Sequence, residues 1–91
     1  MAALLREAVP RTNRLAATFK RTRLARGLSQ QDVADLLNTT QATIDRWERG
    51  VMIPRERYVV HFAQAFELDA NELLGFRAAA IRYAERKRRA A

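Results

Sequence analysis

The sequence predicts an all-α fold in one small domain, and three features support this prediction. Apolar residues recur at the three- and four-residue spacing of helices along most of the chain, and no segment alternates as a strand does. Helix-capping residues stand before several of these segments, with Ser29 the clearest example. The length of 91 residues is enough for one core and leaves little to spare.

The first third of the chain is expected to hold one short and one longer helix. Residues 2–9 form the short helix, which Pro10 ends. The longer helix covers about residues 14–26, and Gly27 stops it. The residues expected on its inward face include Leu15, Phe19 and Leu24.

The stretch over residues 27–50 predicts two short amphipathic helices joined by a tight turn. Ser29 is placed to cap the first helix, with Asp32 three residues on completing a capping box. Asn38 ends that helix at a position that favours left-handed backbone, which asparagine tolerates well. Thr40 is placed to cap the second helix. The residues expected to face inward are Val33, Ala34, Leu37, Ile44 and Trp47.

Two further helices and a helical tail are expected downstream. After a loop at residues 50–53, Pro54 is suited to the first turn of a helix that continues to about residue 66. Asp69 caps a fifth helix that ends at Gly75, and residues 76–89 again favour helix. The apolar side of the fourth helix is formed by Tyr58, Val59, Phe62, Ala63 and Phe66.

The net charge of +7 indicates a polyanionic partner, but this charge is unevenly distributed. Residues 1–27 carry seven basic residues and one acidic residue, a net +6. Residues 28–75 carry four and eight, a net −4, and residues 76–91 carry six and one, a net +5. Nonspecific attraction to a polyanion should therefore come mainly from the two flanks.

The chain from about residue 15 to residue 75 resembles the helix-turn-helix proteins of the phage lambda repressor and Cro superfamily, also called the XRE family. The matching residues are Phe19, Arg23, the run Gly27-Leu28-Ser29-Gln30, Ala34, Ile44, Trp47, Glu48, Gly50, Pro54, Phe62, Ala63, Leu68, Glu72, Leu73, Leu74 and Gly75. Thr22 and Asn38 depart from the pattern, which usually has an apolar residue and a glycine there.

The resemblance implies a five-helix lambda repressor-like DNA-binding domain with a helix-turn-helix at residues 14–75. An N-terminal arm at residues 1–13 precedes it. A basic C-terminal extension at residues 76–91, helical in part, follows. The resemblance also implies a partly buried structural ion pair between Arg23 and Glu48.

The helix at about residues 41–49 is expected to read bases in the major groove of double-stranded DNA. Its face opposite Ile44 and Trp47 carries glutamine and arginine, which can bond adenine and guanine, and an alanine that can touch a thymine methyl group. The expected base contacts are Gln41, Ala42, Thr43 and Arg46, with Thr43 equally able to contact a phosphate or to pack. The expected phosphate contacts are Gln30, Thr40, Arg49 and Arg55.

Two features of the same surface allow more than one interpretation. Asp45 and Arg49, four residues apart, are expected to form a surface pair, although Asp45 is also able to accept from cytosine. The basic run at residues 86–89 is typical of a solvated tail, but it is also able to reach flanking phosphates.

The DNA-bound form is expected to be a homodimer on a two-fold operator, with half-sites about one helical turn apart. The interface must come from the fifth helix, the extension or the arm. Phe76, Ala80, Tyr83 and Ala84 form a narrow apolar stripe that packs either on a second chain or back on the core.

Enzymatic activity, cofactors and metal binding are not expected. The sequence holds no nucleophile with a matched base, no glycine-rich phosphate loop, no cysteine, and a single histidine, His61. No apolar run approaches the roughly 18 residues of a membrane span, and the start lacks a signal-peptide pattern. We therefore expect a protein of the bacterial cytoplasm, associated with the nucleoid when it is bound to DNA.

The predicted function is sequence-specific binding of double-stranded DNA by a transcriptional regulator, with repression as its action. One alternative is the antitoxin of a type II toxin–antitoxin pair, which binds a protein partner through the N- or C-terminal extension. The other is a protein-interaction module of the same fold that has lost operator binding. Retention of Gln41 and Arg46 on the exposed face argues against the second alternative.

Overall fold

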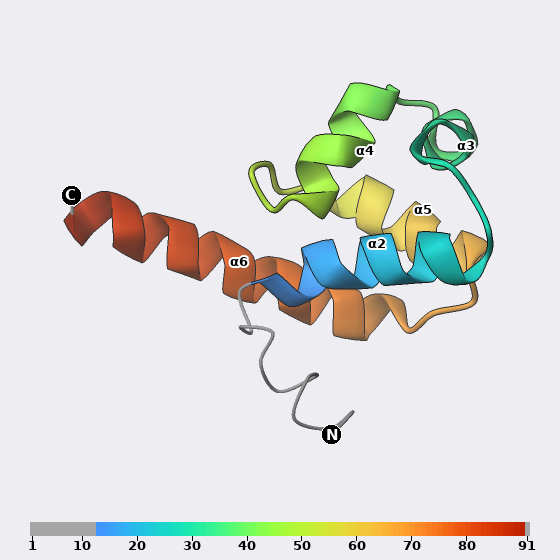
Figure 1. Cartoon of the computed structure of the whole chain (residues 1–91). Helices are drawn as coiled ribbons and strands as arrows, with labels where there is room; N and C mark the ends of the chain where they lie inside the picture. Colours follow the sequence, from blue (N-terminus) through green and yellow to red (C-terminus); the bar gives the residue numbers. More distant parts are fainter. Residues whose placement is uncertain (1–12, 91) are drawn as a thin grey trace, which may run out of the picture.

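Five helices make up the part of the chain that the structure, a computed structural model, describes, namely residues 13–90 (Figure 1). In chain order they are α2 (Arg14–Ala25), α3 (Gln30–Leu37), α4 (Gln41–Glu48), α5 (Glu56–Ala65) and α6 (Ala70–Ala90). The predicted all-α fold is confirmed. The helix expected at residues 2–9 lies outside the described residues.

The local signals around α3 and α4 act as the sequence predicts. The Ser29 hydroxyl accepts from the Asp32 amide over 3.0 Å, and the Ser29 amide donates to the Asp32 carboxylate over 2.8 Å, which completes the capping box. Asn38 adopts the left-handed conformation with φ of 56° at the end of α3. Thr40 caps α4 by accepting from the Thr43 amide over 3.2 Å. These contacts satisfy backbone groups that a helix end leaves without partners.

The predicted start of α5 is wrong by two residues. Arg55 is the N-cap, and its extended backbone (ψ of 155°) breaks the helical path between Pro54 and Glu56. Pro54 is buried and precedes the helix instead of occupying its first turn. Glu56 then stands in the first turn of α5, where a negative charge interacts favourably with the helix dipole.

The predicted end of the fifth helix is also wrong. Asp69 does cap it, accepting from the amides of Asn71 and Glu72 over 2.9 and 3.3 Å. The helix then passes through Gly75 without interruption and continues to Ala90. A glycine inside a helix costs about 0.5–1 kcal/mol relative to alanine, and burial of Leu73 and Ala79 on either side offsets this cost.

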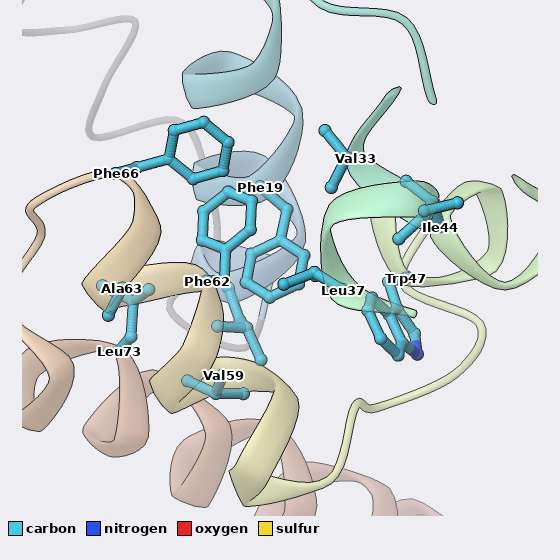
Figure 2. Packing of buried hydrophobic residues seen from close by; sticks show 12 residues of the cluster. Phe19, Val33, Leu37, Ile44, Trp47, Val59, Phe62, Ala63, Phe66 and Leu73 are labelled. Atoms are coloured by element: carbon cyan, nitrogen blue, oxygen red, sulfur yellow. The ribbon is translucent and has the colours of Figure 1, made fainter. Parts of the chain in front are cut away.

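The core is built around aromatic contacts among three helices (Figure 2). The ring of Phe19 stacks on that of Phe62 with centroids 4.1 Å apart, and Trp47 meets Phe19 edge-on at 5.8 Å. Phe66 lies 4.6 Å from Phe62, and Tyr58 lies half-buried beside Trp47 at 5.2 Å. Edge-on and offset aromatic pairs of this kind stabilise a core beyond their apolar area alone.

One predicted inward residue is misplaced. Leu24 is 57% exposed. It lies five residues after Phe19, which is about 140° around the helix from the buried face. Arg23, four residues after Phe19, takes the inward position instead and is buried. The inward side of the last turn of α2 is therefore charged.

Helices α3 and α4 lie together at one end of the molecule, whereas the longer α6 extends past the other helices (Figure 1). Helix α2 contacts both α4 and α6, and α5 contacts both α3 and α6. The C-terminal turns of α6 extend beyond the remaining helices (Figure 1), and every side chain over residues 85–90 is exposed. None of the helices within residues 13–90 is long and apolar enough to cross a membrane.

Candidate nucleic-acid interface

Helix α4 divides into a buried side and an exposed side. Ile44 and Trp47 are almost completely buried in the core, at 0% and 3% exposure. Residues on the opposite side face solvent: Gln41, Ala42, Arg46 and Arg49 are exposed, and Thr43 and Asp45 are partly exposed. With α3 bracing it, α4 is therefore a short helix whose free face carries hydrogen-bonding side chains.

The side-chain amide of Gln30, at the start of α3, connects α3 to α4 at three points. Its Nε2 donates to the carboxylate of Glu48 over 3.1 Å and to that of Asp45 over 3.3 Å. Its Oε1 accepts from Nε2 of Gln41. Gln30 thus holds the first turn of α4 against α3 and fixes the direction of the Gln41 side chain. The family resemblance implied only a phosphate contact for Gln30, and its contacts with Asp45, Glu48 and Gln41 were not predicted.

Gln41 keeps the groups that adenine recognition requires. One of its amide hydrogens is directed to Gln30, whereas its Oε1 and the other hydrogen have no partner within residues 13–90. An adenine edge in the major groove offers one donor and one acceptor, which matches this free pair. Gln41 is therefore oriented by the protein and still available to a base.

Arg46 is exposed on the same face, and its guanidinium makes no hydrogen bond or ion pair with another side chain of residues 13–90. Its planar fork of donors fits the two acceptors that guanine presents in the major groove. Ala42 beside it exposes only a methyl group. The face is thus able to make both polar and apolar contacts to bases.

Asp45 and Arg49 form the surface pair expected from their spacing. Nε of Arg49 donates to Oδ2 of Asp45 over 2.8 Å, with 59% and 39% of the two side chains exposed. The hydrogen bond from Arg49, followed by that from Gln30, lowers the pKa of the Asp45 carboxyl. The remaining guanidinium donors of Arg49 stay open to solvent, so a phosphate contact is compatible with the pair.

The other expected phosphate-binding groups differ in how free they are. The hydroxyls of Thr40 and Thr43 bond each other over 2.9 Å, which leaves one hydroxyl hydrogen for an outside acceptor. Arg55 is exposed at the start of α5. Both amide hydrogens of Gln30 are engaged, so its backbone amide at the start of α3 is the more accessible donor.

A nearly buried ion pair supports the interface from behind. Arg23 donates to both carboxylate oxygens of Glu48, over 2.7 and 3.0 Å, and to the Leu28 carbonyl over 2.9 Å. The hydrogen bond to Glu48 raises the pKa of Arg23, against the opposing effect of desolvation. One guanidinium therefore joins α2, the segment before α3, and the end of α4. This is the ion pair that the family resemblance implied.

Some contacts that position the site had no signal in the sequence. Arg26 donates to the Phe66 carbonyl over 3.0 Å and lies over the Phe66 ring at 5.3 Å, tying the end of α2 to the end of α5. These residues are 40 positions apart, and neither belongs to a recognisable motif.

No cluster of three or more potential metal ligands occurs within the part of the chain that the structure describes.

Comparison with known families agrees with this geometry. Residues 14–76 match the family described as "Helix-turn-helix domain", which lies within the XRE/Cro-like group and whose domain implies DNA binding. No curated protein and no solved structure matches the chain. The match covers more than half of the sequence and includes both α3 and α4, so the chain belongs to this helix-turn-helix family.

Proposed function

We propose that this protein is a sequence-specific regulator of transcription that binds double-stranded DNA and represses by occupying an operator. The observation that carries the proposal is the state of Gln41 and Arg46. Both lie on the free face of α4 with base-recognising groups unengaged, while the surrounding polar side chains are bonded to one another. A face that kept no free donors or acceptors would be better suited to a structural role.

In the proposed complex, α4 enters the major groove. The base contacts are Gln41, Ala42, Arg46 and, from the partly exposed position, Thr43. The phosphate contacts are Gln30, Thr40, Arg49 and Arg55.

A homodimer is part of this proposal, because one short helix in one groove reads too few bases to define an operator. Phe76 packs against the core below Arg14, so this end of the apolar stripe is already covered. Tyr83 is 44% exposed, and Val51 and Met52 are exposed in the loop after α4. Val51 and Met52 are the apolar surface we assign to the second copy, whereas Tyr83 lies under Lys87.

The antitoxin alternative has one supporting observation, the exposed helical turns of α6 over residues 85–90. A toxin would bind there or on the N-terminal arm while α4 still bound DNA. Co-expression with the product of an adjacent gene distinguishes the two functions, because an antitoxin restores growth and a simple repressor does not.

Selection of preferred sequences from random DNA tests the proposal. The wild-type protein should enrich one two-fold symmetric motif. Arg46→Ala should lose about 1–3 kcal/mol on that motif and relax selection at one guanine. Arg46→Lys, which keeps the charge, should lose the same discrimination and retain more affinity for random DNA. The proposal is wrong if wild-type protein enriches no motif, or if Arg46→Ala weakens selected and random DNA equally.

A further inference from the structure

The C-terminal part of α6 lies beside the segment that follows α4. A groove of about 390 Å³ is lined by Gly50 and Ile53 from that segment, by Asn13, and by α6 side chains, among them Lys87 and Arg88. Figure 1 shows the same relation, with the loop after α4 next to the outer half of α6. Lys87 and Arg88, which follow the last residue of α4 by 39 and 40 positions, therefore lie beside the segment after the base-reading helix.

The basic residues of α6 fall on two sides of the helix. At 100° per residue, Lys87 and Arg88 share a side with Ala80 and Ala84, and all four line the groove. Residues 82, 86 and 89, all arginines, are centred on the opposite side. Lys87 lies over the Tyr83 ring, 5.7 Å from its centroid, which restrains it on the side facing the groove.

The helices that carry the base-reading face have a net negative charge and lack the positive charge that Lys87 and Arg88 supply. Residues 28–75, which include α3, α4 and α5, carry a net charge of −4. Such a segment has little attraction of its own for a phosphate backbone. Residues 76–91 carry a net +5, so α6 supplies positive charge that the base-reading elements lack.

The direction of α4 places its end near a DNA strand. A recognition helix reaches base edges with its N-terminal residues. The eight residues of α4 are about 12 Å long, which exceeds the roughly 8.5 Å depth of the major groove. The segment after α4 therefore stands at the edge of the groove, where the phosphates lie, and Lys87 and Arg88 stand beside this segment.

We propose that Lys87 and Arg88 bind the phosphodiester backbone of the same DNA duplex, beside the C-terminal end of α4. This inference rests on the proposed function, since it takes the position of the duplex from α4. It assigns to α6 a phosphate contact that lies outside the helix-turn-helix match, which ends at residue 76.

Paired charge removals on the full-length protein test the inference. Lys87→Ala/Arg88→Ala removes the two groove-facing cations, and Arg82→Ala/Arg86→Ala removes two cations from the opposite side of the same helix. Affinity for the selected duplex is measured by fluorescence anisotropy from low to moderate salt. The first variant should reduce the magnitude of the salt slope by about 3.6 for the bound dimer, or about 1.8 per protomer, since each phosphate contact contributes about 0.9. The control variant should change it by less than half as much. Circular dichroism and thermal unfolding establish that both variants fold.

Three outcomes decide between this contact and its alternatives. Equal salt slopes in the two variants overturn it, because general charge would then explain the loss. It is also overturned if sedimentation shows that Lys87→Ala/Arg88→Ala dissociates a dimer and this accounts for the whole loss of affinity. The inference is supported if only the first variant shows the reduced salt slope while it still prefers the selected duplex to a scrambled one. If the wild-type protein shows no preference for the selected duplex over a scrambled one, the proposed function is wrong. The difference in salt slope between the two variants still tests the phosphate contact.

Discussion

Arg77 reaches across the domain to Pro54, and Nε of Arg77 donates to the Pro54 carbonyl over 2.8 Å. Nη1 of the same arginine lies 3.6 Å from the Glu56 carboxylate in the first turn of α5. Arg77 lies beyond Gly75, the residue at which the sequence predicted the helix to end. The continuation of α6 is thus bonded to the start of α5, and the turns just after Gly75 contribute to the same core.

This bond leads to a prediction about truncation. Removal of all residues after Gly75 should destabilise the domain by about 2 kcal/mol or more, because it deletes the apolar contacts of Phe76 and Ala79 and the Arg77 hydrogen bond. Removal of residues after Ala84 deletes only exposed side chains of the described helix and should change stability by less than about 0.5 kcal/mol. Urea unfolding of the two truncated proteins measures the difference. Equal midpoints would contradict it.

Glycine-to-alanine substitutions test the continuity of α6. Gly75 lies inside the helix, and a Cβ added there meets no atom within 4 Å, so Gly75→Ala should stabilise by about 0.5–1 kcal/mol. Gly50 has φ of +74°, so Gly50→Ala should instead destabilise by about 1 kcal/mol. Thermal unfolding measures whether each substitution raises or lowers the stability of the protein. A loss of stability in Gly75→Ala would indicate a helix that ends there.

The Arg23–Glu48 pair should be costly to break. Glu48→Ala leaves the guanidinium of Arg23 nearly buried without its main partner and should destabilise by about 3 kcal/mol. Replacing both residues with leucine and methionine should recover part of this loss. Arg49→Ala, which breaks an exposed pair, is the control and should cost less than about 0.5 kcal/mol. Chemical denaturation measures all three, and similar losses for Glu48→Ala and Arg49→Ala would contradict a buried role.

Gln30 and Gln41 should act together in DNA binding. Because Gln30 orients the Gln41 amide, Gln30→Ala should reduce selection at the adenine read by Gln41, while its backbone amide stays available to a phosphate. A double-mutant cycle on the selected duplex should give a coupling energy of about 0.5–1.5 kcal/mol. Strictly additive losses would show that each glutamine contacts DNA independently.

The capping box of α3 predicts a pH dependence. The hydrogen bond from the Ser29 amide lowers the pKa of Asp32, so the folded state favours the ionised carboxylate. This contribution is complete above the unfolded pKa, near pH 4, and is lost as pH falls through the folded value. Wild-type protein should therefore lose its advantage in unfolding free energy over Asp32→Asn as the pH falls below about 4. An equal change in unfolding free energy for the two proteins across this pH range would contradict a stabilising role for the ionised Asp32 carboxylate.

The sequence alone determined the features that depend on near neighbours. The caps at Ser29 and Thr40, the left-handed Asn38 and the inward Ile44 and Trp47 all follow from residues within a turn or two. The exposure of Gln41, Ala42 and Arg46 follows equally, because helical periodicity puts them opposite the buried pair. Helix caps and helical faces can be predicted from the sequence because the residues that form them lie within a turn or two of one another.

Tertiary structure decided what depends on distant partners. Arg23 is buried in the last turn of α2 because Glu48 is there to receive its hydrogen bonds, and Gln30 also braces α4 because Asp45 and Glu48 lie within reach. Gly75 ends no helix, since the turns beyond it gain contacts with the core. At Gly75 the local preference is worth about 1 kcal/mol or less, and burial of apolar residues beyond it exceeds this cost.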